Sequence, residues 1–230
     1  MKSKRKLQSE DLRRIFQNRA PGAEEGHKFF SVLVPVVQKE DGLYLLYEVR
    51  AKHMTRQPGE VCFPGGEMEN MESSQACALR ETWEEIGIRP EKIEVVNQLD
   101  TIYTYSNFTM YCYLGLLEES TLEELRLNPD EVEEVFLLSL DDLMAAEPEV
   151  YKTKLVPEIP KDFPYERVTG GKDYKWRTGT AVVPVYEADG RIVWGLTARI
   201  TKRMIEHIKE SGSEIVGSNH EIEERKGRNV

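Results

Sequence analysis

Residues 66–88 of the chain read GEMENMESSQACALRETWEEIGI. The pattern predicts a helix over roughly residues 72–86. At 3.6 residues per turn, Glu81, Glu84 and Glu85 share one face of this helix, and Arg80 lies one turn before Glu84, where the two side chains can pair. The apolar residues of the opposite face predict the stripe that packs against the core: Ala76, Leu79, Trp83 and Ile86.

The acidic face has two interpretations. On most helices such a face is simply solvated. Here three carboxylates within about one turn repel one another unless a cation neutralises them, and Mg²⁺ and Mn²⁺ prefer oxygen ligands. The loop Phe63-Pro64-Gly65-Gly66 directly precedes the stretch, and its glycines allow the backbone to approach a ligand closely. These features together favour a metal site over a solvated face.

The composition excludes several classes of protein. The 230 residues include 31 basic and 41 acidic ones, for a net charge of −10, so we expect no nucleic-acid partner. No apolar stretch reaches the roughly 18–20 residues of a membrane-spanning helix, so we expect no membrane partner. The three cysteines never occur as Cys-x-x-Cys, which argues against a disulfide framework or structural zinc site and favours a reducing compartment.

Helical and strand-like patterns are mixed along the chain and predict one α+β domain without an internal repeat. We expect an N-terminal helical extension over residues 1–27, whose short helix has Ser9 as its N-cap. The main domain is expected over residues 28–210, with a hairpin near its start and a final helix beginning at Thr197. Residues 211–230 are polar and contain two glycines, which predicts a frayed tail.

The positions of the acidic stretch resemble the Nudix box, the signature of the Nudix hydrolases. The matching residues are Gly66, Glu72, Arg80, Glu81, Glu84, Glu85 and Gly87. The resemblance implies a Nudix α/β/α sandwich with a mixed sheet and a central catalytic helix. It also implies Mg²⁺ or Mn²⁺ as cofactor, held by the three glutamates of the acidic face, with the carbonyl of Gly65 as a further ligand. Arg80 would orient a glutamate, and Glu72 would brace the loop.

A later acidic segment offers one more catalytic carboxylate. Members of the family often draw a base or metal ligand from a loop after the box, and residues 128–134 of this chain read NPDEVEE. Glu131 is the favoured candidate. The alternative, in which these acids only keep a strand edge soluble, stays open.

The segment before the box narrows the substrate. Residues 45–66 are similar to a second motif of the coenzyme A diphosphatase branch, in which an arginine and a later Phe-Pro-Gly-Gly recur. We therefore expect Phe63, Gly65 and Gly66 to contribute to substrate binding. Arg50 and Arg56 form a local basic cluster, and a guanidinium can bond two phosphate oxygens, which suits the 3′-phosphate of coenzyme A. The alternative is that these basic residues only solubilise a strand end.

The sequence thus predicts a diphosphatase of coenzyme A or acyl-coenzyme A, with Glu81, Glu84, Arg80 and Glu131 as catalytic residues. ADP-ribose, NADH or a nucleoside triphosphate are alternative substrates. A second alternative is a module that senses a nucleotide without hydrolysing it. The expected partner is a small molecule, and a homodimer stays open because dimers are frequent among similar proteins. The C-terminus is no peroxisomal address, so we expect a cytoplasmic location.

Overall fold

The computed structural model describes the backbone of residues 6–227 and the side chains of residues 6–212. The described α-helices are α1 (Ser9–Phe16), α2 (Ser74–Ile86), α3 (Leu140–Ala145) and α4 (Gly195–Gly227). Short 3₁₀ turns cover Pro90–Lys92, Glu119–Glu124, Tyr165–Arg167 and Gly171–Asp173. The described strands are β1 (Lys28–Lys39), β2 (Gly42–Arg50), β3 (Val61–Cys62), β4 (Gly65–Glu67), β5 (Glu94–Gln98), β6 (Ile102–Tyr103), β7 (Phe108–Glu118), β8 (Val132–Ser139), β9 (Glu149–Leu155), β10 (Gly179–Ala188) and β11 (Arg191–Trp194).

The central element is an eight-stranded mixed sheet. Its main order is β3-β2-β1-β7-β5, and β4, β6 and β8 pair with β1, β7 and β2 respectively. The long pairing of β1 with β7 is parallel, while the other pairs are antiparallel. Residues 36–39 of β1 pair with β2, and residues 30–32 of β1 pair with β4. This second pairing brings the glycine-rich loop into the middle of the fold.

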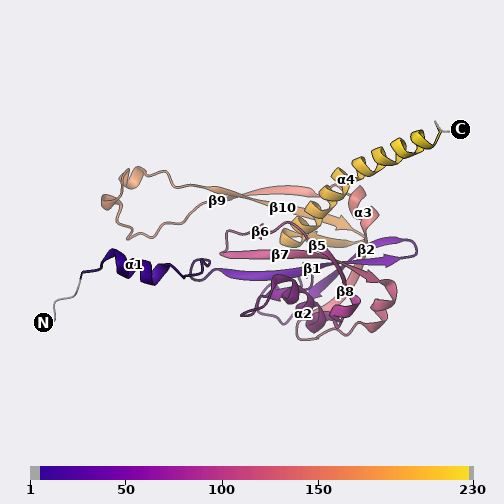
Figure 1. Cartoon of the computed structure of the whole chain (residues 1–230), viewed down its shortest axis with the longest axis horizontal. Helices are drawn as coiled ribbons and strands as arrows, with labels where there is room; N and C mark the ends of the chain where they lie inside the picture. Colours follow the sequence, from indigo (N-terminus) through magenta and orange to yellow (C-terminus); the bar gives the residue numbers. More distant parts are fainter. Residues whose placement is uncertain (1–5, 228–230) are drawn as a thin grey trace.

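Both faces of the sheet are covered, which confirms the predicted α+β sandwich (Figure 1). Because side chains alternate along a strand, Leu46 of β2 packs in the cluster on the α2 side, while Tyr47 packs in the cluster on the α4 side. On the α2 side, Leu46 joins Ala78 and Ile86 of that helix. The α4 side is closed by α4, α3 and a second sheet of order β11-β10-β9.

Two terminal predictions need correction. The N-cap of α1 is Gln8 rather than Ser9, because the backbone N–H of Gln8 donates to the Asp11 carboxylate at 3.0 Å. The tail predicted as frayed is helical through Gly227, because each residue added to an existing helix gains a backbone hydrogen bond and glycine costs only about 1 kcal/mol. Residues 1–5 and 228–230, which belong to these two segments, lie outside the described residues.

The sequence analysis also missed β9. This strand pairs with β10, and residues 156–178 connect the two. Six of the seven residues of β9 are exposed, so the strand shows no alternation of apolar and polar residues. None of the helices that the structure describes is long and apolar enough to cross a membrane.

Candidate active site

Helix α2 presents its acidic residues differently from the prediction. Its buried residues include Ala78, Thr82, Glu85 and Ile86, whereas Trp83 is 55% exposed. The expectation that Trp83 belongs to the packed stripe, opposite all three carboxylates, is therefore wrong. The packed face can contain Thr82 because its hydroxyl donates to the Ala78 carbonyl at 2.7 Å. Glu85 consequently faces the interior, and Glu84 faces solvent.

Small residues opposite the helix explain this rotation. Glycines occupy the first two positions of β4, so no side chain fills the space beside α2. An added Cβ at Gly66 would lie 2.3 Å from the Glu81 carboxylate. The backbone N–H of Gly65 donates to Glu85 Oε2 at 2.8 Å. The glycine pair thus gives Glu81 room and provides Glu85 with a donor, while the predicted carbonyl ligand at Gly65 and the substrate contacts of both glycines stay predictions.

Arg80 joins three carboxylates of the signature. Its Nε and Nη2 donate to the two oxygens of Glu72 at 2.9 and 3.1 Å. Its Nη1 donates to Glu81 at 2.8 Å and to Glu84 at 2.9 Å. The predicted pair with Glu84 is confirmed, and Glu72, in the loop before α2, is fixed to the helix by a two-pronged ion pair. Arg80 therefore sets the positions of the two outer glutamates.

A further carboxylate, which the sequence analysis missed, lies on the same side of the sheet. Glu48 of β2 is only 1% exposed, and its Oε1 accepts a hydrogen bond from the Cys62 thiol at 3.1 Å. Its Oε2 is buried without a hydrogen-bond partner. The available signal was a single acid inside the apolar run LLYEV of residues 45–49. A charged residue is almost never fully buried unless it is paired, so its position in that run could have identified it.

Burial and like charges disfavour the ionised state of these acids. Desolvation, with the charge of Glu48, raises the pKa of Glu85 to about 10. Desolvation likewise raises the pKa of Glu48 to about 7 and raises that of Glu81 above its usual value. The guanidinium of Arg80, by contrast, lowers the pKa of Glu72. The inner part of the site therefore holds carboxylates whose negative charge needs an additional positive charge nearby.

These pKa values predict how the stability of the metal-free protein changes with pH. Glu48 and Glu85 titrate at about 7 and about 10 in the folded state, against about 4.3 in an unfolded chain. The folded state binds both protons more tightly, so their stabilisation is complete below the unfolded pKa and is lost as the pH rises through the folded values. We expect the Tm in EDTA to fall from pH 6 to pH 9, as measured by calorimetry. A Tm that rises over this range would contradict the assignment.

The loop with Glu131 is attached to the end of α2. The backbone N–H groups of Arg126 and Asn128 donate to the carbonyls of Ile86 and Glu85 at 2.9 and 2.8 Å. Asn128 also donates from its side chain to Glu131 Oε2 at 3.1 Å. The negative charge of Glu131 contributes to the raised pKa values of Glu81, Glu85 and Glu48. The structure therefore brings Glu131 into the acidic cluster, and its role as base stays a prediction.

The basic cluster before the box is partly organised. The side chain of Arg50 donates to the backbone carbonyl of Arg56 at 3.4 Å, and Arg56 itself is exposed. The charge of Arg50 lowers the pKa of Glu48, so Arg50 lies near the acidic cluster. Phe63 is 3% exposed and stacks on Tyr47 with ring centroids 4.8 Å apart. Its side chain is a core residue in this structure, which corrects its prediction as a substrate contact.

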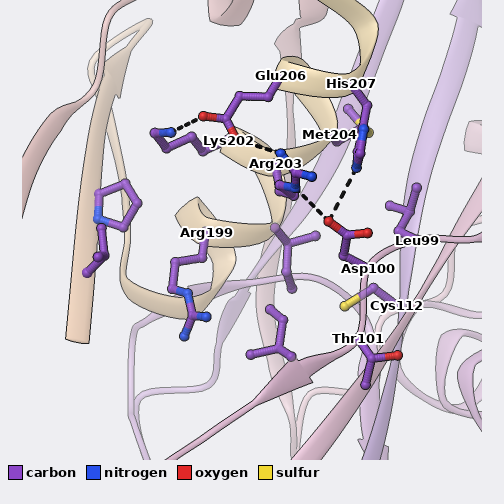
Figure 2. Close-up of a pocket in the computed structure, with 14 residues that line it drawn as sticks. Leu99, Asp100, Thr101, Cys112, Arg199, Lys202, Arg203, Met204, Glu206 and His207 are labelled. Carbon is purple, nitrogen blue, oxygen red and sulfur yellow. Dashed lines mark hydrogen bonds and ion pairs between the residues drawn. The ribbon is translucent and has the colours of Figure 1, made fainter. Parts of the chain in front are cut away.

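A cavity of about 330 Å³ lies on the other face of the sheet, between α4 and strands β6, β7 and β10 (Figure 2). Its walls include the apolar side chains of Ile102, Cys112 and Met204. At its rim, Asp100 accepts hydrogen bonds from Arg203 at 2.6 Å and His207 at 3.3 Å. None of the acidic residues of α2 lines this cavity, so it is separate from the carboxylate cluster.

The carboxylate cluster fits a divalent cation by its chemistry. No three His, Cys, Asp or Glu side chains within residues 6–212 are already arranged around one point as metal ligands. However, carboxylate oxygens are the ligands that Mg²⁺ and Mn²⁺ prefer. The Oε2 atom of Glu48 has no hydrogen-bond partner, and the pKa values of Glu85 and Glu81 are raised. Both features are expected of buried acids that lack a neutralising charge nearby. A cation would supply that charge.

Comparison with known proteins identifies the class. Residues 27–158, more than half of the chain, match the NUDIX domain. The chain therefore belongs to the Nudix family, as its signature predicted.

Its relatives include coenzyme A diphosphatases, which supports the predicted resemblance to that branch. It is 39% identical over 136 residues to the mouse (Mus musculus) peroxisomal coenzyme A diphosphatase NUDT7, an alignment covering 58% of this chain and 56% of that protein. It is 31% identical over 174 residues to the mouse mitochondrial coenzyme A diphosphatase NUDT8, covering 75% of this chain and 74% of that protein. It is also 36% identical over 122 residues to Nudix hydrolase 3 of Caenorhabditis elegans, covering 52% and 51%. The match to NUDT7 and to Nudix hydrolase 3 thus spans about half of their length.

Proposed function

We propose that the protein is a metal-dependent hydrolase that cleaves the diphosphate of coenzyme A or acyl-coenzyme A. The products are adenosine 3′,5′-bisphosphate and 4′-phosphopantetheine or its acyl form. The observation that supports the proposal most is the arrangement around Arg80, which fixes Glu81 and Glu84 beside the inward-facing Glu85. The similarity to NUDT7 and NUDT8 supports the choice of substrate.

Each residue of the site has a definite task in this reaction. Glu81, Glu84 and Glu85, with the carbonyl of Gly65, hold Mg²⁺ or Mn²⁺. When bound, such an ion neutralises the diphosphate and lowers the pKa of a coordinated water. Arg80 keeps the outer glutamates in position. Glu131 accepts the proton of the attacking water.

The basic pair outside this cluster would bind the substrate. Arg50 and Arg56 would contact the phosphates, because the side chain of Arg50 already holds the segment that carries Arg56. Arg50 also lies close enough to the cluster to influence the pKa of Glu48. This proximity supports the assignment of the basic pair and the carboxylates to one site.

The proposal is tested by a product assay with Mg²⁺ and then Mn²⁺. We expect coenzyme A or acetyl-coenzyme A to give a higher kcat/KM than ADP-ribose, NADH or a nucleoside triphosphate, with adenosine 3′,5′-bisphosphate as a product. A higher kcat/KM for ADP-ribose or NADH would still support hydrolysis of a diphosphate. It would refute the assignment of residues 45–66 to the coenzyme A motif. Binding of nucleotide without turnover of any substrate would favour the sensor instead. The sensor is the weaker candidate because it does not need the three glutamates of the signature, which are all present.

The remaining attributes belong to the same proposal. The substrate is a small molecule, and a homodimer stays open. A cytoplasmic location stays a prediction, since the peroxisomal and mitochondrial locations of the two mouse relatives describe those proteins.

A further inference from the structure

Glu48 lies outside the Nudix signature, yet it is the most deeply buried carboxylate of the cluster. It is 1% exposed, compared with 4% for Glu85. It lies on β2, where it pairs with Cys62 of β3. Cys62 in turn precedes Gly65 by three residues. Leu46, two positions earlier on the same strand, packs against the residues of α2. Since side chains alternate between the faces of a sheet, Glu48 points to the same face as Leu46, toward the helix that carries Glu81 and Glu85.

The hydrogen bonding of Glu48 is incomplete. Its Oε1 accepts from the Cys62 thiol, which is a weak donor, and its Oε2 has no partner. Leaving such a group buried and unsatisfied costs about 1–3 kcal/mol, or more if it is charged. A purely structural role does not explain this cost, because an apolar residue of similar size would pack at this position without it.

Within residues 6–212, no basic side chain is hydrogen-bonded or ion-paired to Glu48. Arg50 follows it by two positions, after an irregularity in the pairing of β2 with β8, and its side-chain hydrogen bond goes to the Arg56 carbonyl. The nearest guanidinium on the helix, Arg80, is occupied by Glu72, Glu81 and Glu84. The group that interacts with Oε2 of Glu48 must therefore come from outside the protein.

We infer that Glu48 is a further ligand of the divalent cation, provided from strand β2 by a residue that the signature does not contain. The cation would then be held between two elements, the helix α2 and the strand β2, rather than by the helix alone. This arrangement explains why an acid lies within the otherwise apolar run of residues 45–49. The inference rests on the proposed function only in the kind of cation it names.

The experiment measures metal binding without substrate. Glu48→Gln keeps the size of the side chain and removes its charge, while Glu48→Asp keeps the charge and withdraws the carboxylate by one methylene group. Mn²⁺ affinity is measured by electron paramagnetic resonance of the free ion, and the metal-induced rise in Tm by calorimetry. We expect Glu48→Gln to weaken Mn²⁺ binding about tenfold or more and to reduce the rise in Tm, and Glu48→Asp to fall between it and the wild type.

The matched control is Glu94→Gln, which removes one negative charge from an exposed position of β5, outside the cluster. It should bind Mn²⁺ within about threefold of the wild type, because an exposed charge is largely screened. Mn²⁺ affinity unchanged in both Glu48 variants, or in whichever of them folds, would overturn the inference. Since no substrate is present, failure of the coenzyme A assay would not affect this result.

Discussion

Replacing Glu84 by Gln is expected to lower kcat by at least about 100-fold while leaving the fold intact. Glu84 is the outermost glutamate of the signature, with a side chain that is 50% exposed. An exposed ion pair such as the one it forms with Arg80 contributes at most about 1 kcal/mol to stability, so the Tm should change by only a few degrees. The loss of activity therefore reports on chemistry rather than on folding.

The measurement is kcat with whichever diphosphate substrate gives the highest kcat/KM, alongside the Tm of the same preparation. Glu94→Gln again provides a control that removes one negative charge at an exposed position away from the site. Turnover by Glu84→Gln at the rate of the wild type would show that this carboxylate takes no part in the reaction. The assignment of the signature acids would then have to be abandoned.

The two neighbouring glycines of β4 should respond to alanine in opposite ways. At Gly66 the new Cβ would lie 2.3 Å from Glu81 Oε1, so the carboxylate must move away from Arg80. The atom in the way is the end of a side chain, so we expect a small change in Tm. Misplacing a reacting group by about 1 Å can cost about 100-fold, and we expect a loss of kcat of that order.

At Gly65 the obstacles belong to the backbone of β1. The new Cβ would lie 2.3 Å from the carbonyl oxygen of Ser31 and 2.7 Å from the Cα of Val32. Strand β1 cannot yield without disturbing its pairing, so we expect Gly65→Ala to destabilise the protein by about 1–3 kcal/mol, seen as a lower Tm. Gly22→Ala is the control, because nothing lies within 4 Å of the added carbon. Equal effects of Gly65→Ala and Gly66→Ala on Tm and on kcat would contradict this division.

The local part of the site could be predicted from the sequence. The pairing of Arg80 with Glu84 depends only on the spacing of residues along a helix, and that spacing is fixed by helix geometry. The strands of the hairpin were found from another local signal, because each is a short, mostly apolar run that is buried in the structure.

The rotation of α2 could not be predicted in the same way. Which face of a helix packs depends on what lies opposite, and here the Gly65 backbone N–H of β4 donates to Glu85 while Gly66 leaves room for Glu81. Trp83 was expected in the core because it is large and apolar, but the helix places it at the surface. Glu48 was missed because its neighbours in the site come from distant parts of the chain. Its own segment shows only an acid among apolar residues.

The two backbone hydrogen bonds between α2 and the loop of residues 126–128 constrain how the site can adapt. They make the helix and the segment with Glu131 a single mechanical unit, in which the separation of the acidic groups is set by the main chain. The segment of residues 51–60, most of whose side chains are exposed, joins the same unit at its start, because the backbone N–H of Ala51 donates to the Glu131 carbonyl at 2.8 Å. The exposed side chains of this segment can therefore be exchanged while the main chain keeps the acidic groups at their present separation.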